Sequence, residues 1–148
     1  MTYVQNGGTF IVQYNVVEGA LDSIGPYPLK IGRERVSVEE APVTFVRADH
    51  PLLNRPNRIT SDDFEGWVQE RGLYFASSWD KKYEAVIASS DPGEKPLPGG
   101  LLYARVGKGV YIFTAYSWFR QLPAGVPGAY RIFANLLSAG KAHEPASR

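Results

Sequence analysis

Short apolar runs alternate with turn-forming segments along the chain, a pattern that predicts β-strands joined by loops and a few helices. Residues 3–8 end in two glycines and have the composition of a last helical turn, after which glycine accepts a left-handed backbone. A single turn does not form alone, so we expect either that this chain is the C-terminal part of a longer domain or that its start was set downstream of the natural one. Thr9 to Asn15 is β-branched and aromatic and predicts a strand that is covered on both faces.

The middle of the chain predicts short elements. Residues 16–32 contain two prolines and three glycines and predict a long loop. Thr60 to Asp63 combines a capping hydroxyl with acidic residues, which favours a helix over residues 60–71 that ends at Gly72. Asp62, Asp63 and Glu65 could instead form a cation site or an acid–base pair. Short strands are predicted at residues 36–38, 43–46, 73–76 and 84–89.

The last third of the chain has the strongest local signals. Residues 101–106 and 110–115 flank Gly107-Lys108-Gly109 and predict an antiparallel hairpin. Pro127 can begin a final helix and Gly140 can end it. Its predicted buried face contains Ala129, Phe133, Leu136 and Leu137. We therefore predict one α/β domain with a mixed sheet over residues 1–140, followed by a disordered tail at residues 141–148.

Composition narrows the chemistry that this chain can perform. It has no cysteine, which excludes thiolate nucleophiles, thiolate metal sites and disulfides. Of the two histidines, His143 lies in the predicted tail, which leaves only His50 in a folded setting. We therefore expect no metal site, no cofactor and no catalytic residue, although a Ser–His–Asp arrangement with His50 stays formally open.

Charge and hydropathy also limit the partners. Sixteen basic and 15 acidic residues give a net charge of +1, and the basic residues do not cluster, so we expect no nucleic-acid partner. No apolar run approaches the roughly 20 residues of a membrane helix. The N-terminus lacks the pattern of a signal peptide, and the sequence does not indicate a compartment.

Several distinctive strings together resemble the C-terminal region of long bacterial proteins of the PIG-L/LmbE deacetylase family. They lie at residues 3–9, 12–15, 50–53, 63–75, 91–96 and 118–130. The resemblance covers residues 3–140 and implies a class I glutamine amidotransferase-like domain. Such a domain is flavodoxin-like, with a mostly parallel sheet flanked by helices. The resemblance also implies a carbohydrate context for the protein.

The chain departs from these families where they carry their chemistry. The Pro-His-Pro-Asp-Asp signature of the zinc deacetylase domain is absent, so that activity is not transferred to any residue here. Active amidotransferases carry a cysteine on a strained elbow after a strand. The corresponding strand end holds Tyr14 and Asn15, and neither replaces a thiolate nucleophile.

Two regions are candidates for binding. His50 precedes Pro51 and could line a pocket or act as a base, or it could cap a loop through its imidazole. Tyr116, Trp118, Arg120 and Gln121 combine large aromatic rings with hydrogen-bonding groups, which suits a sugar or a protein partner. The alternative is that these aromatic residues fill the core under the last helix.

Three functional hypotheses follow. The preferred one is a non-catalytic accessory or interaction domain related to PIG-L/LmbE-type proteins. The second is a module that binds a small sugar, and the third is a hydrolase that uses His50. A truncated sheet would also leave an unpaired edge, so we expect a symmetric homodimer.

Overall fold

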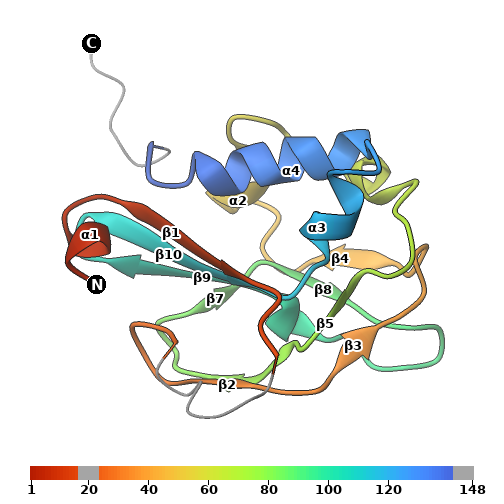
Figure 1. Ribbon diagram of the computed structural model, residues 1–148, viewed down its shortest axis with the longest axis horizontal. Helices are drawn as coiled ribbons and strands as arrows, with labels where there is room; N and C mark the ends of the chain where they lie inside the picture. The colour runs from red at the N-terminus through yellow and green to blue at the C-terminus, as the bar shows by residue number, and fades with distance from the viewer. Residues whose placement is uncertain (17–23, 142–148) are drawn as a thin grey trace.

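A four-stranded sheet forms the centre of the molecule in the computed structural model, which describes residues 1–16 and 24–141 (Figure 1). Its strands follow the order β1-β10-β9-β7. Their bounds are Thr9–Gln13 for β1, Gly109–Thr114 for β10, Leu101–Val106 for β9 and Glu84–Ala85 for β7. β1 runs parallel to β10, whereas β10 and β9, and β9 and β7, are antiparallel.

Three two-stranded antiparallel sheets surround this centre. They pair β2 (Leu29–Ile31) with β6 (Ala76–Trp79), β3 (Arg35–Val36) with β5 (Gly72–Leu73), and β4 (Val43–Phe45) with β8 (Ile87–Ser89). The sheet is thus mixed as predicted, but the expectation of a mostly parallel sheet is wrong for the described residues, since only the β1–β10 pair is parallel. A parallel pair needs a long crossover, usually a helix, and residues 24–100 contain only short helices. The flavodoxin-like arrangement is not confirmed.

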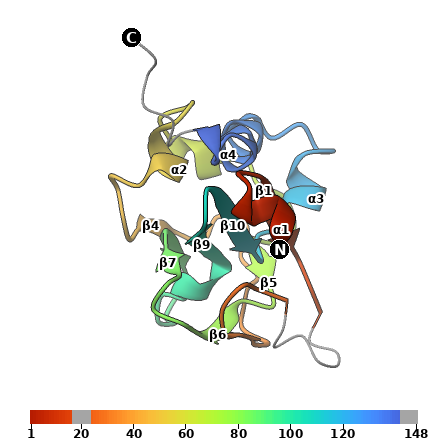
Figure 2. The same ribbon diagram turned by 90° about the vertical axis from the view of Figure 1, so that its left-hand side faces the viewer.

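The helices lie mainly on one side of the central sheet. α4 (Pro127–Leu137) runs along one face with α2 (Pro51–Asn54) beside it, while β2 and β6 lie on the opposite side (Figures 1 and 2). α1 (Thr2–Gln5) precedes β1, and α3 (Trp118–Gln121) follows β10. The described part of the chain also contains the 3-10 turns η2 (Ser61–Phe64) and η3 (Pro98–Gly100). The expectation of helices on both faces is therefore not met.

The predicted helix over residues 60–71 is wrong beyond its first turn. Its start is as expected, because the Asp63 carboxylate accepts the Thr60 N–H at 2.9 Å. The backbone then becomes extended at Glu65 and left-handed at Gly66, with φ of +68°. The side chain of Trp67 is buried, and its Nε1 donates to the Asp63 carbonyl oxygen. Burial of the indole in this way fixes a tight turn where local propensity favours a helix.

The two ends of the chain follow the sequence more closely. The turn α1 ends before Gly7, whose φ is +114°, and the β9–β10 hairpin forms as predicted. β1 also forms, but the expectation that it is covered on both faces is wrong, because Phe10 is 44% exposed. α4 begins at Pro127 and buries Ala129 and Leu136, but Leu137 is 60% exposed and does not belong to the buried face. β2 forms within the predicted loop over residues 16–32, of which residues 17–23 lie outside the described part. Residues 142–148 of the predicted tail also lie outside it.

Candidate functional site

Three of the candidate binding residues are in the core and not on the surface. Tyr116, Trp118 and Gln121 are fully buried. The Trp118 indole N–H donates to Thr114 Oγ1 at 3.0 Å, as a buried indole requires. The Tyr116 hydroxyl is buried without a hydrogen-bond partner among the described residues, and burial raises its pKa above the usual value. These aromatic residues fill the core beneath α4 and present no ring to a ligand.

Gln121 has a positioning role in the fold. Its Oε1 accepts the Val68 N–H at 2.8 Å, and its Nε2 donates to the Val68 carbonyl oxygen at 3.0 Å. A further bond from Nε2 reaches Ser117 Oγ at 3.1 Å. The Gln121 amide thereby gives hydrogen-bond partners to the N–H and C=O groups of Val68, a residue that belongs to no strand. This fixes the segment that carries Gln69 and Glu70 next to α3.

His50 caps a helix. It is 3% exposed, and its Nδ1 accepts the Leu52 N–H at 3.1 Å at the start of α2. The imidazole also lies edge-on to the Tyr103 ring, with the centroids 4.7 Å apart. Its Nε2 lies 3.9 Å from a carboxylate oxygen of Glu84. This geometry matches the capping interpretation of His50 and supplies no base that reaches solvent.

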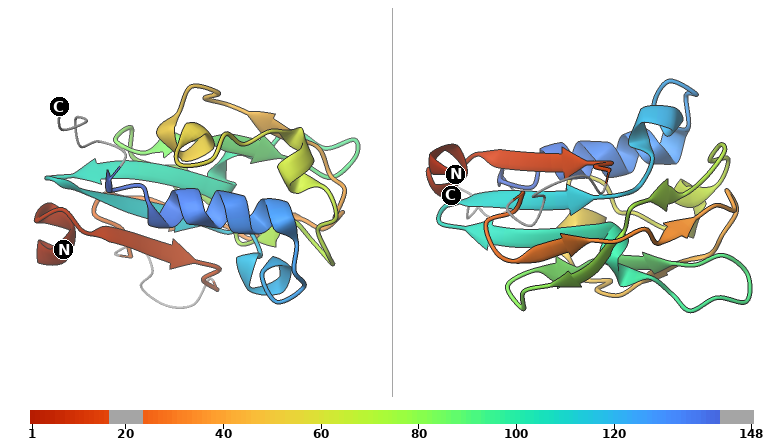
Figure 3. Two further views of the ribbon diagram at one scale, coloured as in Figure 1. Left: turned by 90° about the horizontal axis from the view of Figure 1, so that it is seen from above. Right: turned by 60° about the horizontal axis from the view of Figure 1, so that its bottom comes forward.

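Arg120 is the candidate residue that does reach the surface, and it belongs to a group at the end of β1. We call this group the β1-end cluster and define it as Tyr14, Gln69, Glu70, Tyr74, Phe119 and Arg120. β1 and β10 are parallel, so both carboxyl ends point toward α3, which follows β10 (Figure 3). Ligands of open α/β sheets bind outside the carboxyl ends of the strands. The cluster thus lies at the carboxyl ends of the parallel strand pair of the described residues.

One carboxylate connects the polar members of the cluster. Glu70 Oε1 accepts the Tyr14 hydroxyl at 2.7 Å and Arg120 Nε at 3.0 Å. Arg120 also donates from a terminal nitrogen to Gln69 Oε1 at 2.6 Å. The hydrogen bond to Glu70 is the main reason that the pKa of Arg120 is raised. Burial, and then the hydrogen bond to Glu70, raises the pKa of Tyr14 to about 12.

Aromatic rings form the rest of the cluster. The Phe119 side chain is 47% exposed and meets the Tyr14 ring edge-on, with centroids 4.6 Å apart. The Tyr74 ring also lies edge-on to the Tyr14 ring, with centroids 5.9 Å apart. The Arg120 guanidinium lies 4.8 Å from the Phe119 ring centroid, within cation–π range. An exposed ring beside fixed donors and acceptors is the combination that binds amphipathic ligands.

Three backbone positions in the cluster are strained. Tyr14, Gln69 and Tyr74 have φ values of 50°, 68° and 68°, and they are the non-glycine residues with positive φ in the described part of the chain. Aromatic and other large residues seldom adopt this conformation. Such strain concentrates at ligand-binding and catalytic sites, where the surrounding structure maintains it. Its location in one cluster marks the end of β1 as the candidate site.

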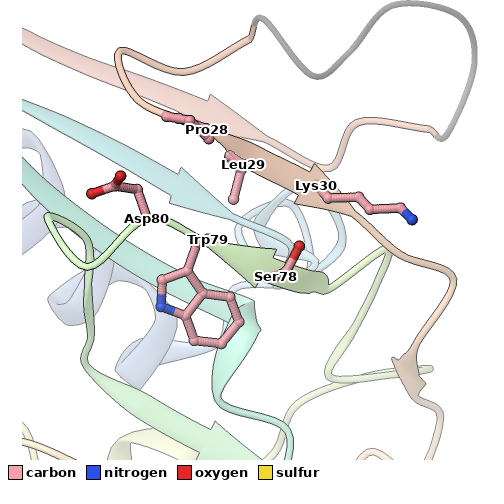
Figure 4. A pocket seen from close by; sticks show the side chains of 6 residues that line it. All are labelled: Pro28, Leu29, Lys30, Ser78, Trp79 and Asp80. Carbon is pink, nitrogen blue, oxygen red and sulfur yellow. The ribbon is translucent and has the colours of Figure 1, made fainter.

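Several hollows lie away from the β1-end cluster. One is lined by residues of the paired strands β2 and β6 and their ends, namely Pro28, Leu29, Lys30, Ser78, Trp79 and Asp80 (Figure 4). The Lys30 and Asp80 side chains point in opposite directions in this view, so they do not converge on a ligand. No group of three potential metal-ligating side chains occurs among the described residues. In the same residues no helix has the length and apolar character needed to cross a membrane.

Comparisons with known protein families, curated proteins and solved structures found no match for this chain. The function is therefore inferred from the geometry of the β1-end cluster.

Proposed function

We propose that this chain is a non-catalytic accessory domain that binds a small carbohydrate at the β1-end cluster. The relation to the C-terminal region of PIG-L/LmbE-type proteins, with its amidotransferase-like ancestry, is part of this proposal. The observation that carries it is the Glu70 carboxylate, which holds the Tyr14 hydroxyl and Arg120 beside the half-exposed ring of Phe119. Sugars present an apolar face to a ring and hydroxyls to charged hydrogen-bonding groups, and this cluster offers both.

The chemistry of Tyr14 supports binding over catalysis. Tyr14 lies at the end of β1, the position at which the amidotransferases that this chain resembles carry their cysteine. With a pKa of about 12, its hydroxyl is protonated at neutral pH and acts as a hydrogen-bond donor. A phenol in this state is a poor nucleophile. The hydrolase alternative gains no support from His50, which is buried at the start of α2.

A titration with a panel of neutral, acidic and amino sugars, followed by backbone amide NMR, tests the proposal. We expect shifts confined to residues 14–15, 69–74 and 117–120. Phe119→Ala should weaken binding by about tenfold, corresponding to the roughly 1.4 kcal/mol of one stacked ring. Arg120→Met, which keeps the apolar stem, should weaken it by a similar factor through lost charge-assisted bonds.

Tyr130→Ala is the matched control, because Tyr130 is 52% exposed on α4 and lies outside the cluster. It should leave the affinity unchanged. Trp118→Ala is unsuitable as a binding test, since Trp118 is fully buried and its removal costs about 3–5 kcal/mol of stability. If no sugar of the panel shifts any amide signal, or if the shifts centre outside the β1-end cluster, the carbohydrate proposal is refuted.

A further inference from the structure

β1 is an edge strand of the central sheet, and its outer side has no strand partner among the described residues (Figure 3). Two bonds to β10 define its orientation. The Gly8 carbonyl accepts the Val110 N–H at 3.0 Å, and the Tyr14 N–H donates to the Thr114 carbonyl at 2.9 Å. Backbone groups alternate in direction along a strand. The N–H and C=O groups of Thr9, Ile11 and Gln13 therefore face outward.

This edge lacks the features that normally prevent pairing. The five residues of β1 include no charge and no proline, and their register with β10 is continuous, without a bulge. The apolar side chains beside the edge are exposed: Phe10 by 44%, Leu137 by 60% and Tyr3 by 66%. On the α4 side, Ile11, Leu137 and Tyr3 line a hollow of about 480 Å³. The edge thus offers unpaired hydrogen-bonding groups between two apolar surfaces.

We propose that β1 pairs with β1 of a second copy of this chain, antiparallel and about a two-fold axis at Ile11. In this register Ile11 lies opposite the second Ile11, Phe10 opposite Val12, and Thr9 opposite Gln13. The outward residues form the hydrogen-bonded pairs, and Phe10 and Val12 form the closer, non-hydrogen-bonded pair. The two sheets become one continuous sheet of eight strands.

The occupant is a second copy because the edge is complementary to itself. A two-fold axis requires each residue to suit its symmetry mate. Aromatic and β-branched residues pair favourably across strands, and Phe10 with Val12 is such a pair. No charged side chain on β1 opposes a like charge in the other copy. Asn15 Nδ2 donates to the Gln13 carbonyl at 3.3 Å, which leaves that oxygen a second lone pair for the partner strand.

Two double variants test both the dimer and its register by light scattering over a concentration series. Thr9→Lys with Gln13→Glu places opposite charges across from each other, so the dimer should persist. Thr9→Lys with Gln13→Lys opposes like charges and should weaken dimerisation by at least about tenfold. Both variants lose the bond that Thr9 Oγ1 accepts from the Gly140 N–H, so they differ only at residue 13.

Disulfide trapping gives an independent readout, because the natural chain has no cysteine. Ile11→Cys places two thiols across the two-fold axis, at a Cα separation of about 5.5 Å that permits a disulfide. Mild oxidation should trap this variant as a covalent dimer. Val46 is 49% exposed just beyond β4 and lies away from β1, so Val46→Cys should form no covalent dimer under the same oxidation. A natural chain that is monomeric at every concentration, or a dimer that both double variants form equally, overturns the proposal.

Discussion

Tyr14 ends β1 in a left-handed conformation, and its hydroxyl donates to Glu70 at 2.7 Å. We expect Tyr14→Phe to lower the free energy of unfolding by about 1 kcal/mol at neutral pH, the usual net contribution of such a bond. The ring contacts with Phe119 and Tyr74 remain in this variant. Urea unfolding at a series of pH values measures the difference between the two proteins.

This difference should depend on pH in one direction. The pKa of Tyr14 in the folded protein, about 12, lies above the usual tyrosine value of 10.0, which applies to the unfolded chain. The contribution of the protonated hydroxyl is therefore complete below pH 10.0 and is lost as the pH rises through about 12. The variant and the natural chain should converge in stability over this range. A constant difference up to pH 12 would mean that the hydroxyl does not titrate as its surroundings require.

At the scale of elements, the contact between α4 and η2 depends on a glycine. A Cβ built on Gly128 would lie 1.9 Å from the Asp63 carbonyl oxygen, a distance that only a backbone shift could relieve. We expect Gly128→Ala to destabilise the protein by about 2 kcal/mol through overpacking. Helix propensity alone predicts the opposite sign, a gain of about 1 kcal/mol. Thermal or urea unfolding of the variant decides between the two.

Ala134→Gly is the matched control, since Ala134 lies in the same helix and its exchange changes propensity without a close backbone contact. It should cost about 1 kcal/mol. A Gly128→Ala variant more stable than the natural chain would show that α4 can move away from η2 without loss.

The elements that the sequence predicts correctly are those with sufficient local signals. The β9–β10 hairpin and α4 each have a glycine or proline at the required position, and their apolar periodicity is regular. The helix expected over residues 60–71 fails because burial of Trp67 outweighs propensity after one turn. β2 forms within a predicted loop because its pairing with β6 is a long-range contact. Sequence patterns do not encode such partners.

The candidate site was predictable only in part. The segment 116–121 does contribute Phe119 and Arg120 to the β1-end cluster, but α3 turns Trp118 and Gln121 inward. Composition cannot distinguish the two orientations in a single helical turn. No sequence pattern marks Glu70 as a site residue, since its role depends on the segment that Gln121 holds in place. Tyr14 could have been found from its place at the end of an apolar strand.

At the scale of the molecule, the central sheet should be the most stable unit. β10 lies between β1 and β9, and each of its residues is buried. We expect its amides to show the slowest hydrogen exchange, at rates that report global unfolding. The two-residue pair β3–β5 should exchange much faster through local opening. Native-state exchange measured by NMR tests this order, and equal protection of β3 and β10 would contradict it.

The positive φ values of Tyr14, Gln69 and Tyr74 also limit how this sequence can vary. Glycine, asparagine and aspartate are the residues that accept this conformation at least cost. Neutral drift at these positions should therefore lead toward those three residues, which keep the backbone but remove the rings and the hydroxyl. Relatives that retain tyrosine at positions 14 and 74 despite the strain would be those under selection for the binding site. The residues that related sequences carry at positions 14, 69 and 74 thus indicate whether the ligand-binding site has been retained.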